Sequence, residues 1–334
     1  MNLSKLNVCP GSLAEGFYSY SPNVLRKVFD GKKVSHILPY NSPKKNEDTQ
    51  ELFLSNRERI SISGVQEKLS LIQVKNKLRL TEPGEQGTHL LKPIPTDLKK
   101  VSEVPANEHL TMQIASQVYN IDTAANALIF FQDGEPAYIT KRFDVKKEGG
   151  KWGKEDFASL AGKSSQTGNP NYKYDFDYLQ LGKLIQQYIP AWQVEIEKFF
   201  ALVVFNFLFS NGDAHLKNFA VLESKAGDYL LSPAYDLINT RLHVGDSNFA
   251  LSGGLFPKEM RSHQYIKTGD PTKKDFEAFA EAIGVHENRI QKIMNPFLER
   301  QDFVEHLISN SFLTESSKKG YLIAYNTRLK LLNH

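Results

Sequence analysis

The sequence predicts an α+β protein with a small β-rich N-terminal half and a larger helical C-terminal half. Up to about residue 143, short apolar runs alternate with polar residues between turn-forming residues, as in strands. After about residue 150, apolar residues recur every three or four positions, as in helices. The 334 residues suffice for two domains, each with its own core. We expect an N-terminal lobe over residues 1–145 and a C-terminal lobe over residues 146–334.

The N-terminal half opens with about 55 turn-rich residues, which include the polar run NSPKKNEDTQ. Four later segments alternate like strands: KLSLIQV (68–74), KLRLTEP (77–83), HLLKPI (89–94) and PAYITKRFD (136–144). A tight KN connection joins the first two into a hairpin. Before the fourth, residues 105–120 place Leu110, Ile114 and Val118 at helical spacing, which predicts one helix with Asn107 as its N-cap.

The C-terminal half contains five segments with helical periodicity: 177–189, 192–211, 273–285, 303–313 and 317–332. The second of them is Phe-rich and apolar on all sides, which predicts a buried helix. Between the second and third, FAVLE (219–223) and DYLLS (228–232) flank the turn SKAG. They predict a β-hairpin that returns the chain to its starting point.

The composition excludes several classes of protein. With 40% hydrophobic and 24% charged residues, the chain resembles ordinary globular proteins rather than disordered ones. The net charge of +3 is too small to argue for nucleic acid as a direct partner. A single cysteine, Cys9, excludes an intrachain disulfide. Because no apolar run resembles a signal peptide or a membrane span, we expect a cytoplasmic protein that does not enter a membrane.

Chemically interesting side chains gather in SNGDAHLKNFAV, residues 210–221, directly after the apolar helix. Asn-Gly-Asp alone is strong turn chemistry, and a single histidine is more often a loop residue than a catalyst. The downstream sequence favours a functional interpretation, because the predicted hairpin leads back to Asp236 in SPAYD. We therefore expect Asp213, Asn218 and Asp236 to converge.

This convergence would suit phosphoryl transfer. The amide of Asn218 and the carboxylate of Asp236 are hard oxygen ligands of the kind that Mg²⁺ prefers, with water and phosphate completing its shell. Asp213 would remain available to accept a proton from an attacking hydroxyl group. The spacing of five residues between Asp213 and Asn218 equals that between the catalytic Asp and the metal-binding Asn of protein kinases.

Candidate nucleotide contacts lie in the N-terminal half. Lys92 stands in the apolar strand THLLKPIP, either as an edge-strand lysine that points to solvent or as an inward functional one. Glu108 on the following helix could be its ion-pair partner or an ordinary acid in the first helical turn. In SISGVQEKLSL, Ser61, Ser63 and Gly64 could turn backbone N–H groups toward phosphates, although one glycine makes neither a P-loop nor a G-x-G-x-x-G motif.

These segments together resemble the HipA family of bacterial toxin kinases, which are serine/threonine kinases with a divergent two-lobed protein-kinase fold. The resemblance rests on SISGVQEKLSL, THLLKP, ITKRFD, NGDAHLKNF and SPAYDLINT, which occur in this order over residues 61–240. Five ordered motifs are more specific than any one of them.

The resemblance implies a role for each matching position. Asp213 would be the catalytic base, Asn218 and Asp236 the metal ligands, and His215 a residue of the nucleotide site. Lys92 would bind ATP phosphates, with Lys141–Phe143 forming the hinge against adenine. Ser61 or Ser63 would be autophosphorylated, and the added negative charge would repel nucleotide from the adjacent loop.

The resemblance also implies partners. Only 60 residues precede the loop serines, so the chain looks like the short HipT-type members, whose missing N-terminal subdomain is a separate small HipS-like protein. A HipB-like antitoxin would bind DNA, which the chain would contact only indirectly. The implied substrate is an aminoacyl-tRNA synthetase, whose phosphorylation arrests translation.

Two alternatives remain open from the sequence. A small-molecule kinase of the aminoglycoside or choline type also uses a Gly-Asp-x-His-x-x-Asn loop, which GDAHLKN fits. SGVQEK and the compact N-terminal half favour the protein kinase. A catalytically silent module held by an antitoxin would have no need for Asp213, Asn218, Asp236 and Lys92 together.

Overall fold

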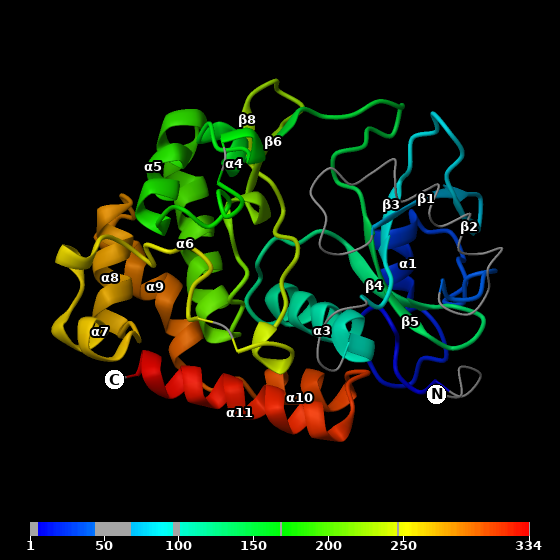
Figure 1. Cartoon of the computed structure of the whole chain (residues 1–334). Coiled ribbons are helices and arrows are strands. Elements are labelled where there is room, and N and C mark those ends of the chain that lie inside the picture. Colours follow the sequence, from blue (N-terminus) through cyan, green and yellow to red (C-terminus); the bar gives the residue numbers. More distant parts are fainter. Residues whose placement is uncertain (1–5, 44–67, 96–100, 168, 246, 334) are drawn as a thin grey trace. The chain divides into compact units, whose positions relative to one another are not determined.

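The computed structural model describes residues 6–43, 68–95, 101–167, 169–245 and 247–333 (Figure 1). The chain forms two compact units. The first contains the chain up to residue 113 together with residues 124–150 and 305–318. The second contains residues 114–123, 151–304 and 319 onward. Each unit is therefore assembled from segments that are distant in the sequence.

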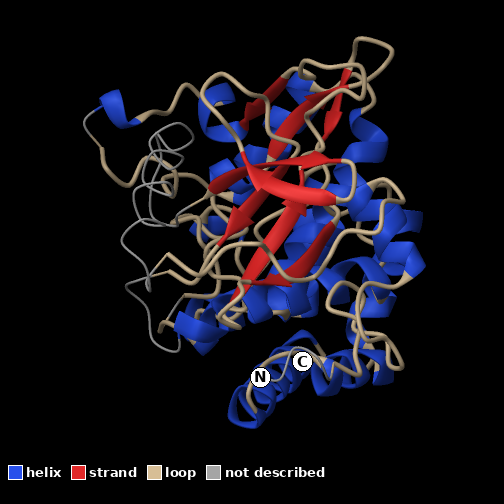
Figure 2. Cartoon of the chain, turned by 90° about the vertical axis from the view of Figure 1, so that its right-hand side faces the viewer, coloured by secondary structure: helices blue, strands red, loops and turns tan. Residues whose placement is uncertain are grey.

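The first unit is built on a five-stranded antiparallel sheet of order β2-β1-β3-β5-β4 (Figure 2). Its strands are β1 (Leu69–Val74), β2 (Lys77–Leu80), β3 (His89–Lys92), β4 (Asn126–Phe130) and β5 (Pro136–Lys141). The hairpin expected around the KN connection is confirmed, since Val74 pairs with Lys77. β3 is the central strand.

The strand β4 was missed by the sequence analysis because it lacks polar alternation. All five of its residues are buried. A strand that is covered on both faces reads as a continuous apolar run and shows no period of two. In this unit the strand pairs with β5 through Ala127 and Ile139, both fully buried.

The turn-rich N-terminal region is part of the core of the first unit. The described part of this region includes the short helix α1 (Pro22–Phe29), whose N-cap Ser21 accepts a hydrogen bond from the Val24 N–H. Phe29 is fully buried and stacks on His89 of the central strand, with ring centroids 5.6 Å apart. The N-terminal region thus packs against the sheet, a role that its polar composition did not predict.

Helix α3 (Val104–Gln117) follows β3 and was expected, but its start was placed wrongly. Asn107 lies inside the helix, where its carbonyl accepts a hydrogen bond from Thr111 Oγ1, and it is not the N-cap. A 3₁₀ turn over Val101–Glu103 leads directly into the helix. The helix therefore starts earlier than predicted. Its first turn is buried, as is every residue from Val104 to Ala115.

Helices dominate the second unit. They are α4 (Phe157–Leu160), α5 (Tyr178–Tyr188), α6 (Trp192–Leu208), α7 (His263–Thr268), α8 (Lys273–Ala282) and α9 (Glu287–Leu298). Among them, α5, α6 and α8 were predicted from the sequence. Helices α10 (Asp302–Asn310) and α11 (Glu315–Leu332) belong partly to each unit. The short helices α4 and α7 and the polar helix α9, which contains Pro296, were not predicted.

The apolar helix α6 forms the core of the second unit, as its sequence predicted. Phe199 is fully buried and meets the rings of Tyr178 on α5 and Phe219, with the Phe219 ring centroid 5.6 Å away. Helix α5 begins at a capping box formed by Asp177 and Gln180 and ends before Pro190. The polar cluster begins directly after the C-terminal end of α6.

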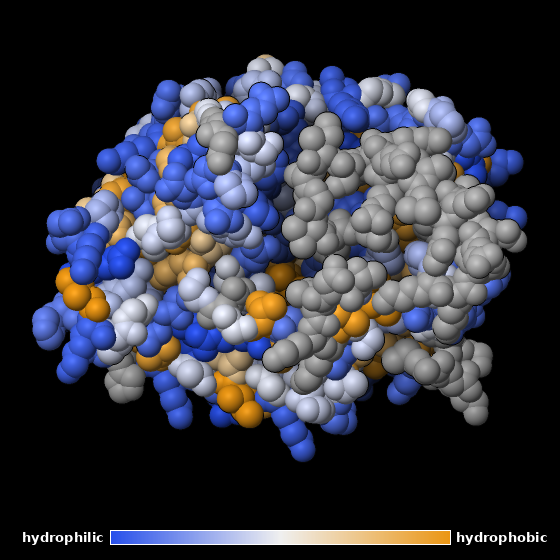
Figure 3. Space-filling view, in the orientation of Figure 1, coloured by the Kyte–Doolittle hydropathy of each residue, from blue (hydrophilic) through white to orange (hydrophobic). Residues whose placement is uncertain are grey.

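A small antiparallel sheet of order β6-β7-β8 completes the second unit. The expected hairpin is confirmed as β7 (Ala220–Glu223) and β8 (Tyr229–Leu231), while β6 (Lys154–Asp156) was not predicted. Among the described residues, no helix combines the length and apolarity that crossing a membrane requires. The face shown in Figure 3 agrees, since polar residues predominate on it and apolar ones occur in small groups.

Candidate active site

The polar cluster follows α6 as a tight loop whose backbone is held at several points. Ser210 has φ 54°, a left-handed conformation that is uncommon for a residue with a side chain. Asn211 donates from its side chain to Asn206 Oδ1 on α6 at 2.9 Å. The loop ends in a 3₁₀ turn over Leu216–Asn218. The side chain of Asp213 is half exposed, at 51%, so a substrate hydroxyl could reach it.

Thr240 joins this loop to the segment that carries Asp236. Its hydroxyl donates to the carbonyl of Ser210 at 2.9 Å and accepts the N–H of Gly212 at 3.0 Å. The Thr240 N–H also donates to the Ser210 carbonyl, at 3.0 Å. The Thr240 residue is buried. One side chain therefore links the residue before Asp213 to the segment after Asp236.

The hairpin β7–β8 returns the chain to the loop, and the structure brings the predicted residues together. The Asn218 side-chain amide donates to Asp236 Oδ2 at 3.4 Å, across 18 positions. The charge of Asp236 also acts on Asp213. Asp236 itself has φ 58°, and such strained residues are concentrated at functional sites. The Tyr235 hydroxyl supports this arrangement by donating to the carbonyl of Lys217 at 2.8 Å.

The side chains of Asn218 and Asp236 fit a Mg²⁺ ion in their chemistry. Both carry oxygen donors, and Mg²⁺ is usually held by one or two protein ligands with water and phosphate. Asn218 Oδ1 accepts the N–H of His215 at 3.2 Å, which orients the amide and leaves one oxygen lone pair for a cation. No cluster of three or more His, Cys, Asp or Glu side chains suited to a metal occurs among the described residues.

Asp213 lies among groups that oppose one another in their effect on its pKa. Loss of water around the carboxylate raises the pKa above its ordinary value, and repulsion from Asp236 adds to this effect. A hydrogen bond from the Tyr174 hydroxyl to Asp213 Oδ1, 2.9 Å long, and the charge of Lys173 act in the opposite direction. The carboxylate is therefore a better proton acceptor than an ordinary aspartate.

His215 is held as a neutral imidazole beside Asp213. Its Nε2 lies 4.0 Å from Asp213 Oδ1, and its ring meets the Tyr174 ring edge-on with centroids 5.2 Å apart. Burial lowers the pKa of His215 to about 4, and the charge of Lys173 adds to the shift. At neutral pH the ring therefore carries no charge that would neutralise Asp213.

The first unit holds the other predicted group of residues. Lys92 Nζ donates to Glu108 Oε1 at 2.6 Å, and both side chains are nearly fully buried. The edge-strand alternative for Lys92 is wrong, because β3 is the central strand and the lysine does not reach solvent. The ring of Tyr138 on β5 lies 5.3 Å from Nζ. A buried ion pair costs much of its attraction in desolvation, so stability alone is a weak reason to keep one.

The remaining predicted site residues lie at the end of β5, just after it, or outside the described residues. Lys141 ends β5, and its ammonium group pairs with Asp30 at 2.6 Å within the same unit. Phe143 follows as a partly buried residue. Ser61, Ser63 and Gly64 lie outside the residues that the structure describes. The hinge and the nucleotide loop therefore stay predictions.

The family of the chain follows from a comparison with protein-family models. The model of the HipA-like C-terminal domain matches residues 60–303, which is most of the chain and includes every predicted site residue. The chain belongs to this family. The resemblance inferred from the five motifs is thereby confirmed.

Several relatives and solved structures are similar to this HipA-like chain. A Haemophilus influenzae protein named "Putative kinase" is 27% identical over 100% of this chain and 98% of its own length. "Putative kinase Y4dM" of Sinorhizobium fredii is 32% identical over 59% of this chain, which spans only 49% of that relative. HipA of Shewanella oneidensis MR-1, solved in complex with HipB and operator DNA, has a TM-score of 0.62 at 19% identity. The proinflammatory kinase CtkA of Helicobacter pylori has a TM-score of 0.51 at 16% identity.

The two structural matches confirm the predicted fold class, a divergent two-lobed kinase-like α+β fold. The HipA match covers 81% of this chain and 63% of the Shewanella protein. The CtkA match covers 79% of this chain and 90% of the Helicobacter protein. This HipA-like chain thus spans less than two thirds of the Shewanella HipA and nearly all of CtkA.

Two residues that contact the site were not found from the sequence. Tyr174 lies 39 positions before its partner Asp213, and Thr240 lies 30 positions after Ser210. Tyr174 stands in NPNYKYD, which has the composition of a surface loop, and Thr240 ends the motif SPAYDLINT. No local periodicity relates either residue to the loop, so only the folded chain reveals these contacts.

Proposed function

We propose that the chain is an ATP- and Mg²⁺-dependent serine/threonine protein kinase that acts as the toxin of a toxin–antitoxin system. The convergence of Asp213, Asn218 and Asp236 in one unit carries the proposal, because phosphoryl transfer needs a base and hard oxygen ligands close together. Membership of the HipA-like family and relatives named as kinases support it.

Each residue has a role in the proposed reaction. Asp213 accepts the proton of the acceptor hydroxyl, whose oxygen forms a bond to the γ-phosphorus while the bond to the leaving ADP breaks. Asn218 and Asp236 would hold Mg²⁺, which would neutralise charge on the ATP phosphates. Lys92, kept in place by Glu108, binds the phosphates, and neutral His215 contributes to the nucleotide site.

Further roles rest on the family resemblance. Lys141 and Phe143 would contact adenine, and Ser61, Ser63 and Gly64 would form the nucleotide loop, with the two serines as autophosphorylation sites. We infer a cytoplasmic protein with a HipB-like antitoxin and a small HipS-like protein as partners. The presence of HipB and operator DNA beside Shewanella HipA supports the antitoxin. The substrate would be an aminoacyl-tRNA synthetase, and its phosphorylation would arrest translation.

The proposal is tested by intact-mass spectrometry of the purified chain after treatment with phosphatase and incubation with Mg-ATP. We expect a gain of one or two phosphates that map to Ser61 or Ser63. The variant Asp213→Asn should gain none, because its amide cannot accept the proton, while its ATP affinity by calorimetry stays within about threefold. Equal phosphate gain in the variant would remove Asp213 from the mechanism. A chain that binds ATP, gains no phosphate and phosphorylates no protein in a lysate would favour the small-molecule kinase.

A further inference from the structure

The segment before α5 places one tyrosine directly on the proposed catalytic base. The Tyr174 hydroxyl donates to Asp213 Oδ1 at 2.9 Å. The ring of the same residue meets the His215 ring at an interplanar angle of 72°, with centroids 5.2 Å apart. Tyr174 therefore contacts two of the predicted site residues with two different parts of its side chain.

The backbone around Tyr174 is fixed, so this contact is part of the fold. The Tyr174 carbonyl accepts the N–H groups of Ser252 at 2.8 Å and Phe176 at 3.0 Å. The Lys173 carbonyl accepts the N–H of Leu216, which belongs to the loop of Asp213, at 3.1 Å. A backbone hydrogen bond therefore joins the segment of Tyr174 directly to the loop of Asp213.

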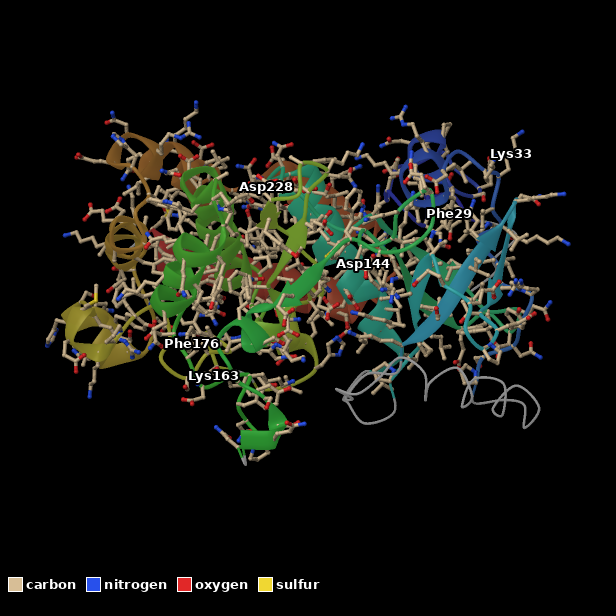
Figure 4. The ribbon with its side chains drawn as sticks, turned by 90° about the horizontal axis from the view of Figure 1, so that it is seen from above. Phe29, Lys33, Asp144, Lys163, Phe176 and Asp228 are labelled. Atoms are coloured by element: carbon tan, nitrogen blue, oxygen red, sulfur yellow. The ribbon has the colours of Figure 1, made fainter. Side chains whose placement is uncertain are left out.

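Neighbouring side chains hold the same segment further. Lys163 and Phe176 lie beside each other (Figure 4), with the ammonium group 5.5 Å from the ring centroid. The same ammonium group pairs with Asp175 at 3.1 Å. These contacts hold the segment on the C-terminal side of Tyr174, whose hydroxyl is directed to Asp213.

We propose that Tyr174 is a positioning residue for the catalytic base. A carboxylate that turns about its last torsion angle presents its oxygens to the acceptor in many orientations. The Tyr174 hydroxyl occupies Oδ1 and limits this rotation, so that Oδ2 is kept for the proton of the acceptor. The half-exposed Asp213 side chain leaves room for that acceptor. This inference rests on the proposed kinase function.

The same hydrogen bond would also be compatible with an inhibitory role of Tyr174. The direction in which kcat changes in the variant distinguishes the two roles. A hydroxyl that donates to the base takes the position that an acceptor hydroxyl would need. If Tyr174 blocked the acceptor, its removal would raise the rate of transfer. Because Tyr174 uses one carboxylate oxygen and Asp213 remains half exposed, we assign the positioning role.

The test compares Tyr174→Phe with Tyr172→Phe in the full chain. Tyr172 lies two positions earlier on the same segment and donates no hydrogen bond to Asp213 among the described residues, so it is a matched control. Tyr174→Phe keeps the ring beside His215 and removes only the hydroxyl. We expect kcat to fall about threefold to thirtyfold, as for loss of a partly exposed hydrogen bond to a charged group, with KM for ATP within about twofold. Tyr172→Phe should match the wild type.

Further measurements separate the possible failures. Thermal unfolding of Tyr174→Phe within about 3 °C of the wild type would show that the fold is kept. Transfer by the wild type with an unchanged or increased kcat in Tyr174→Phe would overturn the positioning role alone. Absence of transfer by the wild type on any acceptor would overturn the proposed function and this inference with it.

Discussion

At the scale of single residues, the buried pair of Lys92 and Glu108 shows how much a local sequence pattern can predict. A lysine in an apolar strand and an acid early in the next helix raised this pairing as one of two alternatives, because the two elements are adjacent in the chain, and the structure has the pair. The contact of Tyr174 with Asp213 was not predictable in this way, since it depends on how a loop folds over another loop.

The pair also gives a prediction for Glu108→Gln. The substitution leaves the Lys92 ammonium buried without its countercharge, so the lysine should lose its proton or its fixed position. We expect ATP affinity to fall about tenfold or more, measured by calorimetry with Mg-ATP. Glu82→Gln, an exposed acid outside this pair, is the control. ATP affinity equal to the wild type in Glu108→Gln would argue against Lys92 as a phosphate ligand.

At the scale of elements, the periodic segments were predicted and the segments without a period were not. β1, β2, α5 and α6 show clear alternation or helical spacing, and the structure has them where the sequence placed them. β4 was missed because burial on both faces removes the alternation. The convergence of the site was predictable because a single hairpin connects its two segments. The hydrogen bonds of Thr240, which join the two segments, were not predictable.

That link, Thr240, yields a prediction for the loop as an element. Thr240→Val keeps the shape of the side chain, but it leaves the buried N–H of Gly212 without its acceptor and removes one of two donors to the Ser210 carbonyl. We expect the free energy of unfolding to drop by about 1–3 kcal/mol in urea titrations, together with a lower kcat. Thr240→Ser, which retains the hydroxyl, should keep most of the free energy of unfolding and most of the kcat. If Thr240→Val had the unfolding free energy and the kcat of the wild type, the hydrogen bond from the Thr240 N–H to the Ser210 carbonyl would be sufficient to hold the loop.

At the scale of the whole molecule, buried histidines make stability depend on pH. Burial lowers the pKa of His89 and of His109 to about 4, well below the ordinary value of 6.5. The unfolded chain therefore binds more protons than the folded chain below pH 6.5, and the contribution of each histidine to stability is lost as the pH falls from about 6.5 toward 4. Above pH 6.5 both are neutral in either state, and the contribution is fully present.

His109→Gln isolates one of these contributions. The glutamine amide can still donate to the Gly11 carbonyl, which accepts from His109 Nε2 at 3.2 Å, but it does not titrate. Between pH 7 and pH 5.5 we expect the wild type to lose roughly 1 kcal/mol more of its unfolding free energy than the variant. Urea titrations at both pH values measure the difference. Parallel losses in the two proteins would show that His109 titrates normally in the folded state.

The division of the chain into interleaved segments has a consequence for synthesis on the ribosome. The first unit, which holds Lys92 and Glu108, also needs residues 305–318. At about 5–20 residues per second, the ribosome supplies those residues only after nearly all of the second unit has been made. A nascent or prematurely terminated chain that lacks residues 305–318 therefore has an incomplete first unit. For a protein proposed to halt translation, this order of assembly delays completion of the first unit until residues 305–318 have been made.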